Sequence, residues 1–201
     1  MNQPSASRSL DRTVIGVLGA WFCFAVAIGV TGIFEKATAA LVALIVWGLA
    51  ALVLIGCRKG PVLYTWIQNA DFRKLIGIHL VRFVGIYFLV LGSRGDLPNG
   101  FARPAGVGDI VIGLGAVGLL VIPTVPAWQR WLRLWNFFGF IDIVFVAFNA
   151  LRFGLQDSQS MAALRSLPLS LLPTFFVPLI IASHVLIFSR LISSPGIRMP
   201  P

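Results

Sequence analysis

Charge is scarce in this chain of 201 residues, and acidic charge is the scarcest. Only 11% of the residues are charged, and seven acidic residues stand against sixteen basic ones. Soluble domains carry about a quarter of their residues as Asp, Glu, Lys or Arg, so this composition excludes an ordinary soluble domain. The two cysteines, Cys23 and Cys57, do not have the spacing of a metal or disulfide framework, and we expect two buried free thiols.

Motifs that carry catalytic chemistry are missing as well. The chain contains no H-E-x-x-H, no G-x-S-x-G and no phosphate-binding P-loop. The only glutamate, Glu35, lies in the first turn between apolar runs, so no run carries paired glutamates. These absences favour a non-enzymatic function, and with only two histidines and no thiolate cluster we predict no metal site.

Apolar residues, in contrast, make up 58% of the chain, and the mean hydropathy is +0.91. They gather into six continuous runs, each long enough to cross a hydrocarbon core about 30 Å thick as a helix. None of the runs alternates as a membrane β-barrel strand does. We therefore predict an all-α polytopic membrane protein, a single domain over residues 1–201 with a bundle of six transmembrane helices. The predicted spans are residues 13–34, 37–57, 75–92, 107–122, 134–151 and 171–192.

The basic residues between the runs predict the orientation. Those on the side of the N-terminus are Arg8, Arg12, Arg58, Lys59, Arg73, Lys74, Arg130, Arg133, Arg190 and Arg198. This is ten of the sixteen, against five on the other side, so by the positive-inside rule both termini face the cytoplasm. The first run is too long for a cleaved signal and is predicted to be a retained anchor. Because the charges are spread over loops that flank spans, they serve topology, and we expect no nucleic-acid binding.

Three segments break the regular pattern. Residues 60–72 mix apolar, aromatic and polar side chains and are predicted to lie in the inner membrane interface. Residues 93–108 hold four glycines and two prolines, which predicts an ordered outer loop instead of a helix. Asp109 would then begin the fourth span, either as a helix N-terminal carboxylate or with a functional role. Prolines at 168, 173 and 178 predict a bent or unwound outer half of the sixth span.

Ionisable residues inside the spans are the best functional indicators, because they are costly in lipid. At about 1.5 Å per residue from the inner boundary, His79 lies about 7 Å deep, Arg82 about 12 Å, Asp142 about 13 Å and His184 about 9 Å. Arg82 and Asp142 are the natural ion pair, with Asn136 or Asn149 assisting. The pair either locks the third span to the fifth or forms part of a polar site.

The two histidines leave three interpretations open. His79 and His184 at one depth on two helices could be the axial ligands of a b-type haem. Each imidazole could instead hydrogen-bond a neighbouring helix. A single imidazole could also respond to pH or relay a proton.

The run LPNGFARPAGVGDIVIG at residues 97–113 resembles a group of small multi-pass bacterial membrane proteins that carry an LPxxFAxPAGxGD stretch. The similarity covers residues 75–192, and the first two spans match only in character. The group has no established activity, so the resemblance implies a bacterial cytoplasmic membrane and no mechanism. Its pattern includes the residues Arg82, Asp109, Asn136, Asp142 and His184. His79 is not part of the pattern, which weakens the haem interpretation.

Our leading hypothesis is a small polar site among spans three to six, lined by Arg82, Asp142 and His184 and capped by residues 96–108. It would bind or pass a small solute or a proton. A second hypothesis is an accessory subunit that packs against a larger membrane complex, and a third is a haem protein. The bilayer is the expected partner in every case, together with a homo-oligomer or a larger complex.

Overall fold

The computed structural model describes residues 3–123 and 127–193, and the regular elements in these ranges are all helical. In chain order they are α1 (Gln3–Val30), η1 (Ile33–Lys36), α2 (Ala39–Lys59), α3 (Pro61–Asn69), α4 (Phe72–Gly77), η2 (Ile78–Phe83), α5 (Val84–Arg94), α6 (Asn99–Val121), α7 (Trp128–Gln156), η3 (Ala162–Arg165), η4 (Leu172–Phe176) and α8 (Val177–Ser193). Arg198, one of the basic residues used to predict the orientation, lies outside the described residues.

Six helical segments in the described ranges are long and apolar enough to cross a membrane. They are Ser9–Val30, Ala39–Lys59, Phe72–Arg94, Asn99–Val121, Trp128–Gln156 and Leu172–Ser193. The third joins α4, η2 and α5 into one continuous helix. The predicted class, an all-α bundle with six such helices, is therefore confirmed, and by its helix composition the chain is a multi-pass membrane protein.

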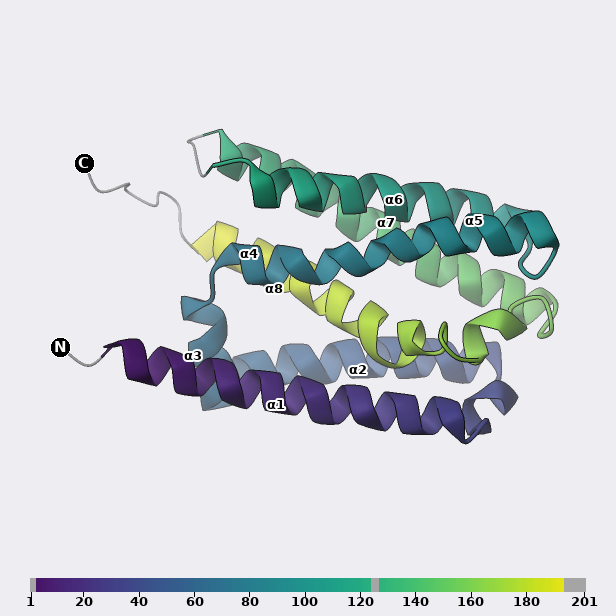
Figure 1. Ribbon diagram of the computed structural model, residues 1–201, viewed down its shortest axis with the longest axis horizontal. Coiled ribbons are helices and arrows are strands. Elements are labelled where there is room, and N and C mark those ends of the chain that lie inside the picture. Colours follow the sequence, from purple (N-terminus) through teal and green to yellow (C-terminus); the bar gives the residue numbers. More distant parts are fainter. Residues whose placement is uncertain (1–2, 124–126, 194–201) are drawn as a thin grey trace.

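The helices form two layers with α8 between them (Figure 1). α1 and α2 lie on one side, α5, α6 and α7 on the other, and α8 contacts both α2 and α7. α8 is accordingly the most buried span, at 56% of its apolar window, whereas α1 is 11% buried. Cys23 on α1 is exposed, so the expectation of two buried thiols holds only for Cys57.

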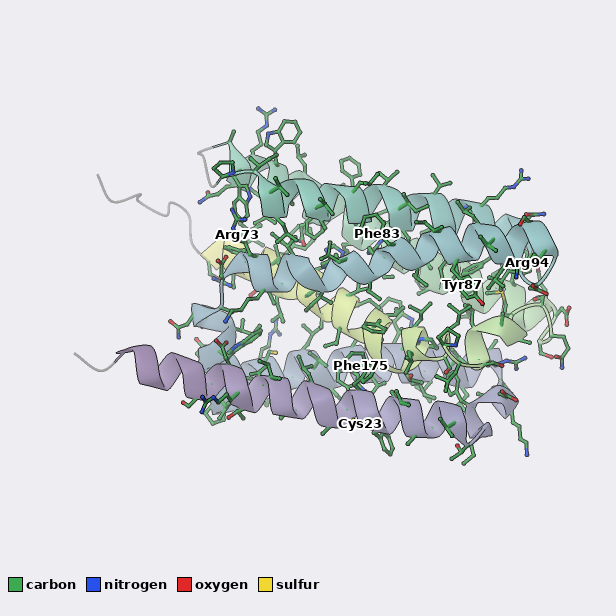
Figure 2. All side chains as sticks on the ribbon, viewed as in Figure 1. Cys23, Arg73, Phe83, Tyr87, Arg94 and Phe175 are labelled. Atoms are coloured by element: carbon green, nitrogen blue, oxygen red, sulfur yellow. The ribbon has the colours of Figure 1, made fainter. Side chains whose placement is uncertain are left out.

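The start of α1 and the end of α8 lie at the same end of the bundle, as six crossings require (Figure 1). Arg73 marks this end and Arg94 the opposite one (Figure 2). Polar contacts join the helices here: Lys74 pairs with Asp11 of α1 at 2.7 Å, and the Arg73 guanidinium donates to the carbonyls that end α6. The short helix α3 sits at this end, where an interfacial segment was predicted. Which side is cytoplasmic stays a prediction.

The prediction of a non-helical loop over residues 93–108 holds only for residues 95–98, because α5 extends to Arg94 and α6 begins at Asn99. Pro104 lies inside the helix and cannot donate to the Gly100 carbonyl four residues earlier. The Asn149 side chain of α7 donates to that carbonyl instead, at 3.1 Å. A buried partner on another helix therefore replaces the missing backbone bond.

The glycines of this segment that lie within α6, Gly100, Gly106 and Gly108, serve helix contact and not loop flexibility. A Cβ added at Gly106 would lie 2.7 Å from the Gly85 carbonyl oxygen, so only glycine lets α6 approach α5 this closely. The true turn is short and centres on Gly95, whose φ of 82° is in the left-handed region.

The predicted irregularity in the sixth span is confirmed. A π-helical turn, η4, precedes α8 and contains Pro173, and Pro178 follows it. Pro178 cannot donate to the Thr174 carbonyl, and the Trp21 indole of α1 donates to it at 3.0 Å. A second proline thus leaves a carbonyl that a tertiary donor satisfies, and this bond attaches α1 to the bundle.

Candidate functional site

A cluster of three charged side chains lies inside the bundle, one each from η2, α6 and α7. Nη1 of Arg82 is 3.0 Å from Oδ1 of Asp109 and 2.5 Å from Oδ2 of Asp142. Nη2 of the same guanidinium donates to the Gly139 carbonyl at 3.1 Å. We call Arg82, Asp109 and Asp142 the carboxylate–arginine cluster.

Two glycines make room for this cluster. A Cβ at Gly108 would collide with Oδ1 of Asp142, so glycine at this position lets α6 accept the carboxylate of α7. A Cβ at Gly139 would lie 2.6 Å from Cε1 of His184. Gly139 therefore admits the imidazole from α8 while its own carbonyl accepts from Arg82. Small residues at these contacts permit the close approach of helices that the buried charges require.

The cluster is buried, and it contains two acidic side chains but one basic side chain. The side chains of Arg82 and Asp109 are 1% and 6% exposed, and that of Asp142 is 17% exposed. With both carboxylates ionised, one guanidinium faces two negative charges, so one unit of negative charge has no counter-charge within the cluster. At membrane depth an uncompensated charge is costly, and protonation of one carboxyl group removes it.

Two histidines whose rings touch at a tilt of 56° lie beside the cluster. The His79 and His184 ring centroids are 4.3 Å apart, and both residues are fully buried. Nε2 of His79 is 2.9 Å from the Ser183 hydroxyl, and Nδ1 of His184 is 2.8 Å from Oδ1 of Asn136. Asn136 also donates to the His184 carbonyl at 3.1 Å. These bonds fix both rings, as expected for polar side chains between membrane helices.

Each imidazole keeps one nitrogen without a hydrogen bond to the described residues. These atoms are Nδ1 of His79 and Nε2 of His184, and Nε of Arg82 is in the same position. Trp135 packs against the histidine rings. Its indole ring is 4.8 Å from that of His79, and its Nε1 donates to the Ile112 carbonyl. The described surroundings therefore leave two ring nitrogens available for a proton.

The geometry does not fit a haem between the two histidines. Axial imidazoles stand on opposite faces of a porphyrin, whereas these rings are in direct contact at 4.3 Å. Nε2 of His79 and Nδ1 of His184 are also already engaged by Ser183 and Asn136. We derive no chemistry through haem.

The structure brings together all six residues that the sequence singled out, with one change of role. Arg82, Asp142, His184 and His79, which were placed at similar depths, lie together, and Asn136 bonds His184. Asp109 does not begin a helix: because α6 starts at Asn99, it lies in mid-helix and pairs with Arg82.

Other parts of the prediction differ from the structure. Asn149 does not reach the cluster and instead bonds the Gly100 carbonyl of α6. The proposed cap of residues 96–108 is mainly the first turns of α6, and only Gly108 at its end borders Asp142. Ser183 was missed, although its position next to His184 inside a span was a usable signal.

Residues 35–192 match the model of a protein family described as a domain of unknown function, DUF8737. The match covers most of the chain, which therefore belongs to this family. The match includes the second span, which the resemblance over residues 75–192 did not cover, and it leaves out α1. No curated protein and no solved structure matches the chain.

Proposed function

We propose that this protein binds and releases a proton at the carboxylate–arginine cluster, as part of proton movement across its membrane. The observation that carries the proposal is that one buried guanidinium nitrogen, Nη1 of Arg82, contacts carboxylates from two other helices. A purely structural ion pair needs one carboxylate. The second gives the site a place where a proton can be held without unbalancing its charge.

Close packing favours a proton over a larger ligand. Arg82 and Asp109 are almost completely enclosed, and the helices approach so closely that a single added Cβ at Gly108 would collide with Asp142. A proton needs no cavity. The solute-binding form of the hypothesis has less support from this geometry than the proton-binding form.

The cluster residues have distinct roles in this proposal. Arg82 is the fixed positive charge that keeps one carboxylate ionised. Asp142 is the carboxylate that exchanges the proton, because its side chain is the most exposed of the three. Asp109 is the permanent counter-ion on α6.

His184 is the next acceptor in line. Its Cε1 and Nε2 lie against Gly139, whose carbonyl accepts from Arg82, so the imidazole adjoins the cluster. The His79 ring follows at 4.3 Å and comes from the first turn of η2, next to α4. Two adjacent imidazoles with one unbonded nitrogen each are suited to receiving a proton from the carboxylate and passing it on.

Infrared difference spectroscopy of the protein in liposomes tests proton binding directly. We expect a carboxylic acid C=O band to change as the pH is stepped from acidic to alkaline, because a carboxyl group that binds a proton gains this band and loses it again on release. The Asp142→Asn variant should lose this band, and the Asp157→Asn variant should keep it, because Asp157 is exposed beyond the end of α7.

Two further variants keep the test decisive. Asp142→Glu retains a carboxyl group and should retain a shifted band even if Asp142→Asn folds poorly. Asp109→Asn removes the excess negative charge, so Asp142 should then stay ionised across the range and its band should disappear. Spectra that are identical in the wild type, Asp142→Asn and Asp109→Asn proteins would refute the proposal.

A further inference from the structure

An open apolar groove separates α1 from α2. Its volume is about 960 Å³, and its walls are formed by residues such as Phe24, Ile28, Leu44 and Leu52. The two helices make few direct contacts along their length. The contacts of α1 are mainly with α3, η1 and η4. Trp21 and Thr174, joined by a hydrogen bond, line the inner end of the groove.

The groove is as long as one leaflet of a membrane. On the α2 side its lining runs from Leu41 to Leu52. Eleven helical rises make about 16 Å, and half of a hydrocarbon core of about 30 Å is about 15 Å. The lining includes residues of η1, at the end of the bundle opposite the start of α1, and on α1 it reaches Trp21 near the middle of the Ser9–Val30 span.

Aromatic rings pack behind Trp21, a residue of the groove lining. The Phe175 ring of η4 lies 4.9 Å from Trp21 and 5.3 Å from Phe22, and Figure 2 shows Phe175 in the space next to α1. These contacts hold the Trp21 indole in place on the wall of the groove.

Lys36 is the single charged residue of the groove lining and stands at its open end. Within the described ranges Lys36 makes no salt bridge. It is exposed and is the last residue of η1. The carboxylate of the neighbouring Glu35 lies over Gly32. An ammonium at the polar end of an apolar groove complements a phosphate headgroup.

From the length, the apolar lining and the placed lysine, we infer that the groove is a binding site for a phospholipid of the leaflet at η1, opposite the start of α1. The acyl chains lie between α1 and α2, and the phosphate lies at Lys36. The lipid replaces the protein contacts that α1 and α2 lack. This inference does not depend on proton binding at the carboxylate–arginine cluster.

Gly48 offers a clean way to fill the groove. It lines the groove, and a Cβ added there would meet nothing within 4 Å, so Gly48→Leu should fold normally while occupying the lipid space. Gly118→Leu is the matched control, because a Cβ at Gly118 also meets nothing within 4 Å and Gly118 lies on α6, away from the groove.

The experiment is native mass spectrometry of the detergent-purified protein with added phosphatidylglycerol. We expect the wild type and Gly48→Ala to retain one phospholipid, Gly118→Leu to do the same, and Gly48→Leu to lose it. Lys36→Gln should weaken retention about fivefold, the value of one lysine facing an anionic headgroup.

Three outcomes would overturn the inference. The first is equal lipid retention by Gly48→Leu and Gly118→Leu. The second is a wild-type protein that carries no phospholipid and is a dimer that Gly48→Leu converts to a monomer, which would make a second copy the occupant. The third is a co-purifying protein that Gly48→Leu releases with no change in bound lipid, which would favour an accessory role in a larger complex.

Discussion

α1 and α2 differ from the four later spans in how far other helices cover them. Their apolar windows are 11% and 17% buried, whereas those of the later spans are 33% to 56% buried. The later spans also hold the charged and imidazole side chains at membrane depth. The comparison indicates that buried charge and dense packing go together: a charge that lipid cannot solvate must be enclosed by protein, and a purely apolar helix need not be.

The family boundary follows the same division in part. The matched region begins at residue 35, so it contains α2 and every residue of the carboxylate–arginine cluster but not α1. α1 is attached at a few places, through Asp11 at one end and through Trp21 and its aromatic neighbours further along. The polar core thus lies within the matched region, and α1 lies outside it.

Removing the charge at the centre of the packed region should have the largest effect. Arg82→Gln leaves two buried carboxylates without their cation, and we expect a loss of about 3–5 kcal/mol in stability. The measurement is thermal unfolding in detergent followed by size-exclusion chromatography. Arg94→Gln, at an exposed position at the end of α5, is the control and should change little. Equal melting temperatures for the two variants would contradict the comparison.

Crowding the packed region should have the next largest effect. Gly139→Ala places a Cβ 2.6 Å from Cε1 of His184, and relief of this overlap should cost about 1–3 kcal/mol. Gly118→Ala meets nothing within 4 Å and should be neutral or stabilising by up to about 1 kcal/mol, through helix propensity. A Gly139→Ala protein as stable as Gly118→Ala would show that α7 and α8 are less tightly packed than described.

The architecture and the members of the site could be predicted because both follow from the cost of polar groups in lipid. Continuous apolar runs define the spans, and ionisable residues within them have to meet. Counting residues along each helix from the inner boundary was enough to predict that Arg82 lies at the depth of Asp142, and His79 at the depth of His184. Asn149 was assigned to the wrong neighbours because of its height: it is buried like Asn136 and Gly139, but it lies seven residues beyond Asp142 along α7, about 10 Å away from the cluster.

The start of α6 could not be predicted, because proline and glycine carry opposite meanings in loops and in packed membrane helices. Pro104 is tolerated inside a helix only because Asn149 of α7 supplies a donor to the Gly100 carbonyl. Gly106 is required by the close approach of Gly85. Both reasons depend on other helices, so local sequence favoured a loop, and the same error placed Asp109 at a helix start.

The replacement of a backbone bond by Asn149 can be tested with a double-mutant cycle. Asn149→Ala leaves the Gly100 carbonyl without its side-chain donor and should cost about 1–2 kcal/mol. Pro104→Ala restores the backbone N–H, so in that background Asn149→Ala should cost clearly less. Unfolding temperatures of the four proteins give the coupling. Additive effects would mean that the side chain and the proline are unrelated.

The smallest loss of stability is expected at α1, the least covered helix. There too a side chain donates to a carbonyl that a proline leaves without its backbone donor. Trp21→Phe keeps an aromatic ring against Phe175 but removes the donor to the Thr174 carbonyl, and we expect a loss of about 0.5–1 kcal/mol. Pro178→Ala supplies a backbone donor for that carbonyl, so the loss should shrink in its presence. Trp131→Phe, at a side chain that is 61% exposed, is the control for replacing a tryptophan. If Trp21→Phe destabilised the protein as much as Gly139→Ala, α1 would be as firmly integrated as α7 and α8, and the contrast between the two regions would fail.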